Sequence, residues 1–251
     1  MIMRRLSWII TLAAIAAMPL FVIRFSLFGL PTTVLEITIL AAVITTILAY
    51  WRKLRDWPTL AQLAVLWVII GLVRALYSPH QWSALGLWRA YFLEATLLAG
   101  CVWTQVRQRG TQYVASLRMV VATLICMGTV VGLYAIYQHF TGYGIPPPWQ
   151  DESVRRVTAW LGYPNAVGLL LAPLVGLGVG AGLNTKTPIL QYTYGTAALI
   201  MTLAVFFAQS EGGLIGIGAG LIVMGLLFSK RTRRVTLAVI VAGAIIIATV
   251  A

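Results

Sequence analysis

The chain has few charged residues and few cysteines. Asp, Glu, Lys and Arg together make up 10% of its 251 residues, whereas soluble domains carry about a quarter. This scarcity excludes an ordinary soluble domain and indicates an integral membrane protein. Two cysteines do not make a disulfide framework, so Cys101 and Cys126 are expected to be reduced packing residues.

Apolar sequence is what the chain has in abundance, with 60% hydrophobic residues and a mean hydropathy of +0.91. The apolar runs lack the alternation of barrel strands, which favours helices. A membrane helix needs roughly 17–25 such residues. We therefore predict an all-α, polytopic transmembrane helical bundle, a single membrane domain over residues 1–251. About nine spans are expected, near 7–23, 32–50, 59–76, 84–103, 114–136, 163–182, 189–209, 212–228 and 235–251.

The net charge of +12 would suit a nucleic-acid-binding protein, but the basic residues cluster in alternate connections between spans. Such clustering orients a protein in the membrane. The opposite side carries Arg24, Arg155 and Arg156. We therefore place the N-terminus in the cytoplasm and expect a lipid bilayer, not nucleic acid, as partner. The predicted cytoplasmic side carries twelve of the eighteen basic residues: Arg4, Arg5, Arg52, Lys53, Arg55, Arg107, Arg109, Lys186, Lys230, Arg231, Arg233 and Arg234.

The first and last residues of the sequence lead to two further predictions. The start, "MIMRRLSWIITLAAIAAMPL", has features of a signal peptide, but the many spans that follow favour an uncleaved first helix. The end, "AIIIATVA", has no polar flank or basic anchor. We expect the chain to be the N-terminal part of a longer architecture.

One external connection is long: residues 137–162, "YQHFTGYGIPPPWQDESVRRVTAWLG". Its three consecutive prolines predict a stiff, extended stretch. Glycines four residues apart in "PLVGLGVGAGL" and "EGGLIGIGAGL", further along the chain, predict close helix packing in lipid.

Ionisable side chains inside a bilayer are costly, so they mark functional sites or ion pairs. Glu36, Arg89 and Glu94 lie within predicted spans, and Arg74 lies at the outer end of one. We expect Glu36 to pair with Arg74 or Arg89. Arg89 and Glu94 are five residues apart, so they are not expected to share a face of an α-helix.

Arg155 and Arg156 lie at the predicted external membrane boundary, beside Trp160 and Tyr163. A guanidinium group donates paired hydrogen bonds to phosphate oxygens. The two arginines would therefore suit an anionic headgroup whose tail stays in lipid, and a polyprenyl diphosphate has that shape.

The segment "RRVTAWLGYPNAVGLLLAPLVGL" resembles one in the O-antigen ligase and O-antigen polymerase family, where an arginine precedes Gly, an aromatic residue and a Pro-Asn helix start. Upstream, "GLYAIYQHFTGYG" is similar to the family's Tyr-Gln turn, and downstream, "LAVFFAQSEGGLIGIGAGL" resembles its Ser-Arg-Gly-Gly segment. The matching residues are Tyr137, Gln138, Arg156, Gly162, Tyr163, Pro164, Asn165, Ser210, Gly212 and Gly213.

The resemblance implies a multi-pass glycosyltransferase of the bacterial plasma (inner) membrane that serves cell-envelope polysaccharide or lipopolysaccharide biosynthesis. Such enzymes transfer a glycan from undecaprenyl diphosphate to an acceptor saccharide or lipid at the periplasmic face, as ligases or polymerases. They use no metal ion and no other cofactor. By resemblance, Arg156, Arg155 and Arg89 would bind the donor diphosphate. The residues that would shape the site are Pro164, Asn165, Ser210 and Glu211.

The sequence departs from the family pattern in two ways. Glu211 stands where the family has arginine, which reverses the charge. The family also continues into a large external loop with a further arginine and a proposed catalytic histidine, which lies beyond these 251 residues. The catalytic base stays open here, with His139, Glu211 and Asp151 as candidates.

Two rival functions remain open at this point. Span number and buried charges would also suit a flippase or transporter of lipid-linked oligosaccharides. The abrupt end and Glu211 would suit a non-enzymatic membrane subunit.

Overall fold

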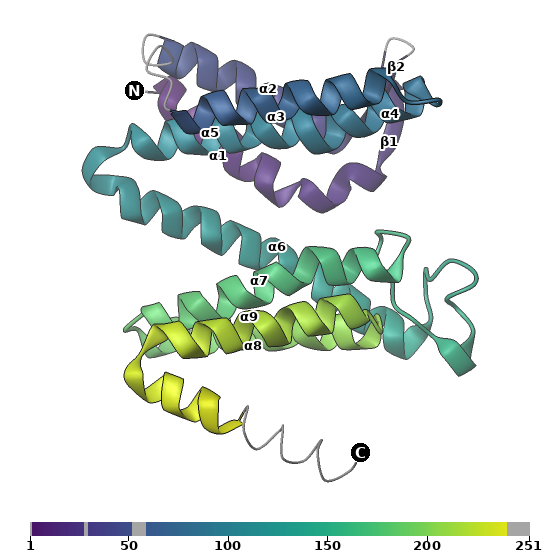
Figure 1. The fold of residues 1–251 in the computed structure, drawn as a ribbon, viewed down its shortest axis with the longest axis vertical. Coiled ribbons are helices and arrows are strands. Elements are labelled where there is room, and N and C mark those ends of the chain that lie inside the picture. Colours follow the sequence, from purple (N-terminus) through teal and green to yellow (C-terminus); the bar gives the residue numbers. More distant parts are fainter. Residues whose placement is uncertain (1, 28–29, 52–58, 240–251) are drawn as a thin grey trace. The chain divides into compact units, whose positions relative to one another are not determined.

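The structure is a computed structural model that describes residues 2–27, 30–51 and 59–239 (Figure 1). Over these residues the chain is mostly helical, which confirms the predicted helical class. The chain divides into two compact units, Met1–Thr123 and Leu124–Ala251. The single membrane domain expected from the sequence stays a prediction.

The first unit is built around helices α1 and α2, with α5 packed on both. The elements are α1 (Ile2–Ala16), η1 (Met18–Val22), β1 (Arg24–Leu27), β2 (Leu30–Thr33), α2 (Val34–Tyr50), α3 (Thr59–Leu76), α4 (Gln81–Trp88), η3 (Arg89–Glu94), α5 (Ala95–Arg107) and η4 (Gly110–Gln112).

A two-stranded antiparallel hairpin, β1 with β2, joins η1 to α2, and the sequence analysis did not predict it. Its register pairs Arg24 with Thr33. Thr33 then ends the hairpin and begins α2, because its side chain accepts from the Glu36 N–H while the Glu36 carboxylate accepts from the Thr33 N–H. This capping box fixes the start of the helix. The hairpin thereby sets where Glu36 lies.

A buried polar cluster joins α1, α2 and α5. Gln105 Nε2 donates to Thr11 Oγ1 at 2.6 Å and to Thr46 Oγ1 at 2.8 Å. Ser7 and Thr46 are joined through their hydroxyls at 3.2 Å. All four side chains are buried. Buried polar groups need partners, so this cluster specifies how the three helices pack.

The second unit contains the end of α6 (Tyr113–Thr141), then η5 (Glu152–Val154), α7 (Pro164–Asn184), α8 (Pro188–Phe207) and α9 (Glu211–Phe228). Helix α7 packs against both α8 and α9 (Figure 1). A Cβ atom at Gly168 of α7 would collide with Ser210, and one at Gly213 would lie 2.9 Å from the Cα atom of Gly168. Among the glycines predicted to pack closely, a Cβ at Gly178 or Gly180 would lie 3.3 Å from Ala198 or Met224, which confirms the prediction there. A Cβ at Gly176 or Gly212 has no neighbour within 4 Å among the described residues.

Five helical segments of the described residues are long and apolar enough to cross a membrane: Gln81–Arg107, Gly110–Thr141, Pro164–Asn184, Pro188–Phe207 and Glu211–Phe228. Val34–Tyr50 and Ala61–Leu76 are apolar but shorter. The predicted count of about nine spans is therefore not confirmed. The predicted span 7–23 differs because α1 ends at Ala16 and the 3-10 turn η1 follows. The predicted span 235–251 lies largely outside the described residues.

Candidate functional site

A pocket of about 470 Å³ lies where α6 and α8 end and α9 begins, within the second unit. Because α6, α8 and α9 all have an end here, polar side chains at helix termini converge on one place. The pocket combines a guanidinium, an imidazole and a carboxylate with apolar walls. Its lining residues are His139, Arg156, Phe206, Phe207, Gln209, Glu211 and Leu214.

Arg156 is held in place by the turn between α8 and α9. Its Nε donates to the Ala208 carbonyl and its Nη2 donates to the Gln209 carbonyl, each at 3.0 Å. Carbonyls at the end of a helix carry partial negative charge, so a cation is favoured there. The guanidinium also lies 5.0 Å from the centre of the Trp149 ring. The structure gives Nη1 no protein partner among the described residues, so the outer edge of the group can bind a ligand.

The turn that holds Arg156 is itself unusual. Gln209 has a φ of +48°, in the left-handed region that residues other than glycine rarely adopt. This conformation turns the Ala208 and Gln209 carbonyls toward Arg156. The sequence "FFAQSEGG" gave no sign of it, because a left-handed turn is usually signalled by glycine or asparagine.

Gln138 anchors the external segment on the end of α6. Its Nε2 donates to the carbonyls of Gly144 and Ala159, at 3.1 and 2.9 Å, and its Oε1 accepts from the Thr158 N–H at 3.1 Å. The side chain is fully buried. Backbone bonds from Arg156 to Trp149 and from Val157 to Phe207 continue the attachment. The segment that carries Arg156 is therefore fixed against both α6 and α8.

His139 contributes an imidazole to the pocket. Its ring stacks on that of Phe207, with centroids 3.8 Å apart and planes 5° apart. Its Nδ1 atom is buried and has no hydrogen-bond partner among the described residues. From the sequence, His139 was predicted only as one of three candidate bases. Its position next to Gln138, at the end of a predicted helix, is the feature that could have indicated its place at the pocket.

Glu211 begins α9 and lines the same pocket. A carboxylate at a helix N-terminus is favoured by the helix dipole. Glu211 makes no ion pair with Arg156 in the described part of the chain. The two opposite charges therefore face a common space without neutralising each other directly. Asp151, the third candidate base, caps η5 through a hydrogen bond to the Ser153 N–H and does not line the pocket.

The remaining predicted residues of this unit have supporting positions. Asn165, at the start of α7, accepts from Arg156 Nη2 through its Oδ1 at 3.3 Å. Pro164 is buried at the first position of the same helix, and Ser210 is buried between α7 and α9. Arg155 lies outside the pocket lining, since its Nη1 donates to the His139 carbonyl at 3.1 Å and its Nη2 pairs with Glu152. Arg155 thus binds the end of α6.

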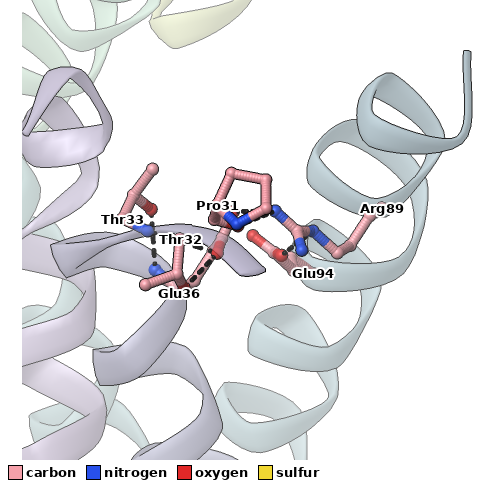
Figure 2. Close-up of polar contacts among 6 residues, drawn as sticks. All are labelled: Pro31, Thr32, Thr33, Glu36, Arg89 and Glu94. Atoms are coloured by element: carbon pink, nitrogen blue, oxygen red, sulfur yellow. Dashed lines mark hydrogen bonds and ion pairs between the residues drawn. The ribbon is translucent and has the colours of Figure 1, made fainter. Parts of the chain in front are cut away.

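Arg89 lies in the first unit, where it joins two carboxylates (Figure 2). Its Nη2 donates to Glu36 Oε1, and its Nε lies 3.4 Å from Glu94 Oε1. Nη2 also contacts the Pro31 carbonyl of the hairpin. The predicted pairing of Glu36 with Arg89 is confirmed. No such pairing with Arg74 is present among the described residues.

The expectation that Arg89 and Glu94 would not share a face is wrong. Residues 89–94 form a π-helix, not an α-helix. The wider turn of a π-helix places residues five apart one above the other, and single turns of this kind are frequent at functional sites. An insertion of this type has no signature in "LWRAYFLEAT", which reads as continuous helix.

Among the described residues, no group of three or more His, Cys, Asp or Glu side chains could hold a metal ion. No family model matches the chain, and neither a curated protein nor a solved structure matches it.

Proposed function

We propose that this protein transfers a glycan from a polyprenyl-diphosphate donor to an acceptor sugar at the external face of a bacterial inner membrane. The observation that carries the proposal is the anchored Arg156 guanidinium at a pocket that also contains an imidazole and a carboxylate. The resemblance of "RRVTAWLGYPN" to the O-antigen ligase and polymerase family supports the same assignment.

The pocket suits a charged leaving group. Its volume of about 470 Å³ lies in the range of small-molecule sites, about 300–1,000 Å³. Two carbonyls fix Arg156 through Nε and Nη2, which leaves Nη1 without a protein partner among the described residues. A fixed donor needs little reorganisation during the reaction, which is the main source of electrostatic catalysis. Arg156 is therefore the diphosphate contact in this proposal.

The reaction then follows from the groups present. The oxygen of an acceptor hydroxyl attacks the anomeric carbon of the donor glycan and forms the new glycosidic bond. The bond from that carbon to the diphosphate oxygen breaks, and the electron pair leaves with the polyprenyl diphosphate. Arg156 stabilises the charge that develops on this leaving group. The proton of the hydroxyl passes to a base of the pocket, either the imidazole of His139 or the carboxylate of Glu211.

Arg155 and Arg89 have different parts in this proposal. Arg155 holds the end of α6 and so positions His139. Arg89 is already bound to two carboxylates and belongs to the other unit. A diphosphate contact from Arg89 stays a prediction of the family resemblance.

The test replaces Arg156 by alanine and by lysine in the chromosomal copy of the gene. Lysine keeps the charge but lacks the Nε donor and the planar fork. We expect glycan transfer to fall about 100-fold or more in Arg156→Ala and to stay strongly reduced in Arg156→Lys. Lys186→Ala, at the other end of α7, removes an exposed charge and should keep wild-type transfer. Immunoblots of membranes confirm that each variant is present.

Three outcomes separate the possible functions. In an enzyme, the Arg156 variants accumulate donor lipid on the external face. A flippase would instead leave the donor on the cytoplasmic face, and a non-enzymatic subunit would lose a partner without accumulation of donor. Normal transfer by Arg156→Ala would refute the proposal.

A further inference from the structure

A basic and aromatic cluster lies at the end of the first unit opposite the Arg89 cluster. It brings together the start of α1, the end of α2 and the turn between α5 and α6. The guanidinium carbon of Arg109 lies 4.3 Å from the centre of the Trp8 ring, and that of Arg4 lies 5.5 Å from the centre of the Tyr50 ring. Arg4 and Trp8 are four residues apart on α1, so they share a face.

Within the part of the chain that the structure describes, two hydrogen-bond donors of this cluster have no acceptor. Trp8 is 4% exposed, yet its indole Nε1 has no partner among the described residues, and the buried Nε of Arg109 has none either. A buried donor without an acceptor costs about 1–3 kcal/mol. Because the two groups stack on each other, a single ligand with several acceptor oxygens can satisfy both.

The charge around the cluster selects the ligand. Arg5 and Arg107 are exposed beside it and add to the positive potential. The acidic residues of this unit that the structure describes, Glu36 and Glu94, are paired with Arg89 at the opposite ends of α2 and of the α4–α5 segment. A ligand here should therefore be an anion.

The helices that carry the donors are held together directly beside them. Ser7 precedes Trp8, and Gln105 lies one helical turn before Arg109. Both belong to the buried cluster with Thr11 and Thr46. The spacing between the start of α1 and the end of α5 is thus fixed, so a ligand would require movement of side chains but not of the helices.

We propose that this cluster binds a phosphate group, through Arg109 and the indole N–H of Trp8, with Arg4 as a further positive charge. Rotation of the partly buried Arg109 side chain brings both donors to one phosphate. The phosphate belongs to the headgroup of an anionic phospholipid or to free phosphate. Basic pockets between membrane helices at the cytoplasmic face bind such headgroups, and the charge distribution predicts that this end is cytoplasmic.

The test uses the full chain, purified in detergent and titrated with phosphatidylglycerol, phosphatidylcholine or inorganic phosphate. Bound lipid is counted by native mass spectrometry, and the melting temperature is recorded in parallel. We expect phosphatidylglycerol to bind and to raise the melting temperature, with an affinity about tenfold lower in Arg109→Gln. Trp8→Phe keeps the ring and removes the donor, so it should weaken binding severalfold.

Matched controls isolate the two donors. Arg107→Gln makes the same change of charge two residues from Arg109, and Trp103→Phe makes the same change of ring on α5, where Trp103 is exposed. Trp103→Phe should bind phosphatidylglycerol within about twofold of wild type, because Trp103 lies outside the cluster and the substitution leaves the charge unchanged. Arg107→Gln removes a nearby charge but neither of the two donors, so it should weaken binding clearly less than Arg109→Gln.

Each result bears on the proposal. Selective weakening in Arg109→Gln and Trp8→Phe supports it, and the ligand that binds tighter, lipid or inorganic phosphate, identifies the source. Equal weakening in Arg107→Gln would show only a diffuse attraction of lipid to positive charge, and would overturn it. Equal binding of phosphatidylcholine and phosphatidylglycerol by the wild-type chain would also overturn it.

Discussion

Gly168 shows how one missing side chain permits the packing on which the pocket depends. A Cβ at this position would occupy the space of the Ser210 hydroxyl, and Ser210 directly precedes Glu211. We expect Gly168→Ala to lower the free energy of unfolding by about 2 kcal/mol, since overpacking of a tight contact costs about that much. Thermal unfolding in detergent measures it.

Gly176 on the same helix is the matched control, because an added Cβ there meets no described residue within 4 Å. Gly176→Ala should be neutral or stabilise by up to about 1 kcal/mol through helix propensity. If both alanine variants unfolded at the same temperature, the close contact of α7 with α9 would not be present in the membrane protein.

Gln138 gives a second prediction at the scale of a residue. Gln138→Leu keeps a similar volume but leaves two carbonyls and the Thr158 N–H unpaired. We expect a loss of about 3 kcal/mol of stability and faster trypsin cleavage after Arg155 or Arg156, as detected by mass spectrometry.

Gln191→Leu serves as the control for this substitution, because Gln191 is exposed and its side chain makes one bond, to the Thr185 carbonyl. It should cost less than about 1 kcal/mol and leave the cleavage rate unchanged. Cleavage that is slow in both variants would mean that Gln138 does not anchor the external segment.

At the scale of an element, the π-helix η3 allows a prediction about the deletion of one residue. A π-turn contains one residue more than an α-helix needs. Deletion of Ala90, which is exposed, should therefore convert 89–94 to α-helix and keep Arg89 and Glu94 on one face. We expect this deletion to keep a melting temperature close to that of wild type.

The same deletion at Gly100, exposed in the middle of α5, is the control. It would rotate Gln105 by about 100° and remove it from Thr11 and Thr46. A large drop in melting temperature, or loss of the monodisperse peak in size-exclusion chromatography, is expected. Equal damage from both deletions would contradict the account of η3.

The elements also show what a sequence can predict. Hydropathy located most helices to within a few residues, because burial in lipid demands long apolar runs. The count of about nine spans that hydropathy predicted is not confirmed, because α1 and α2 have only 15 and 17 residues. The hairpin before α2 and the π-turn arise from tertiary hydrogen bonds and pairing, which leave little trace in composition.

The candidate site was also predictable only in part, because some of its residues are conspicuous in the sequence and its long-range contacts are not. Arg156 and Asn165 are conspicuous in the sequence because a polar side chain beside an apolar run is costly in a membrane and therefore indicates a functional role. The contacts of Arg156 with Ala208 and Gln209 span more than fifty residues of sequence, and the left-handed turn that creates them has no glycine. Arg155 looked equivalent to Arg156, yet successive residues of an extended segment point to opposite sides, and only Arg156 lines the pocket.

At the scale of the whole molecule, the charge distribution predicts which ends of the helices face outward. The connections predicted to be cytoplasmic, which include Lys186 after α7, carry twelve of the eighteen basic residues, whereas the segment before α7, with Arg155 and Arg156, is predicted to be external. In a background with Cys101 and Cys126 replaced by alanine, we expect a membrane-impermeant maleimide to label Ser153→Cys in intact spheroplasts. Thr187→Cys should be labelled only after permeabilisation. Labelling of both sites in intact spheroplasts would overturn the predicted orientation.

The external segment is attached near both of its ends, through Gln138, Arg155 and Arg156, while residues 150–153 stay exposed between the attachments. Such a tip can accept foreign sequence, because no helix has to move to make room for it. A short epitope inserted after Gln150 would display an antibody tag beside the pocket without entering it. Spheroplasts, from which the outer membrane has been removed, could then be stained with an antibody, and the number and location of the molecules followed by light microscopy.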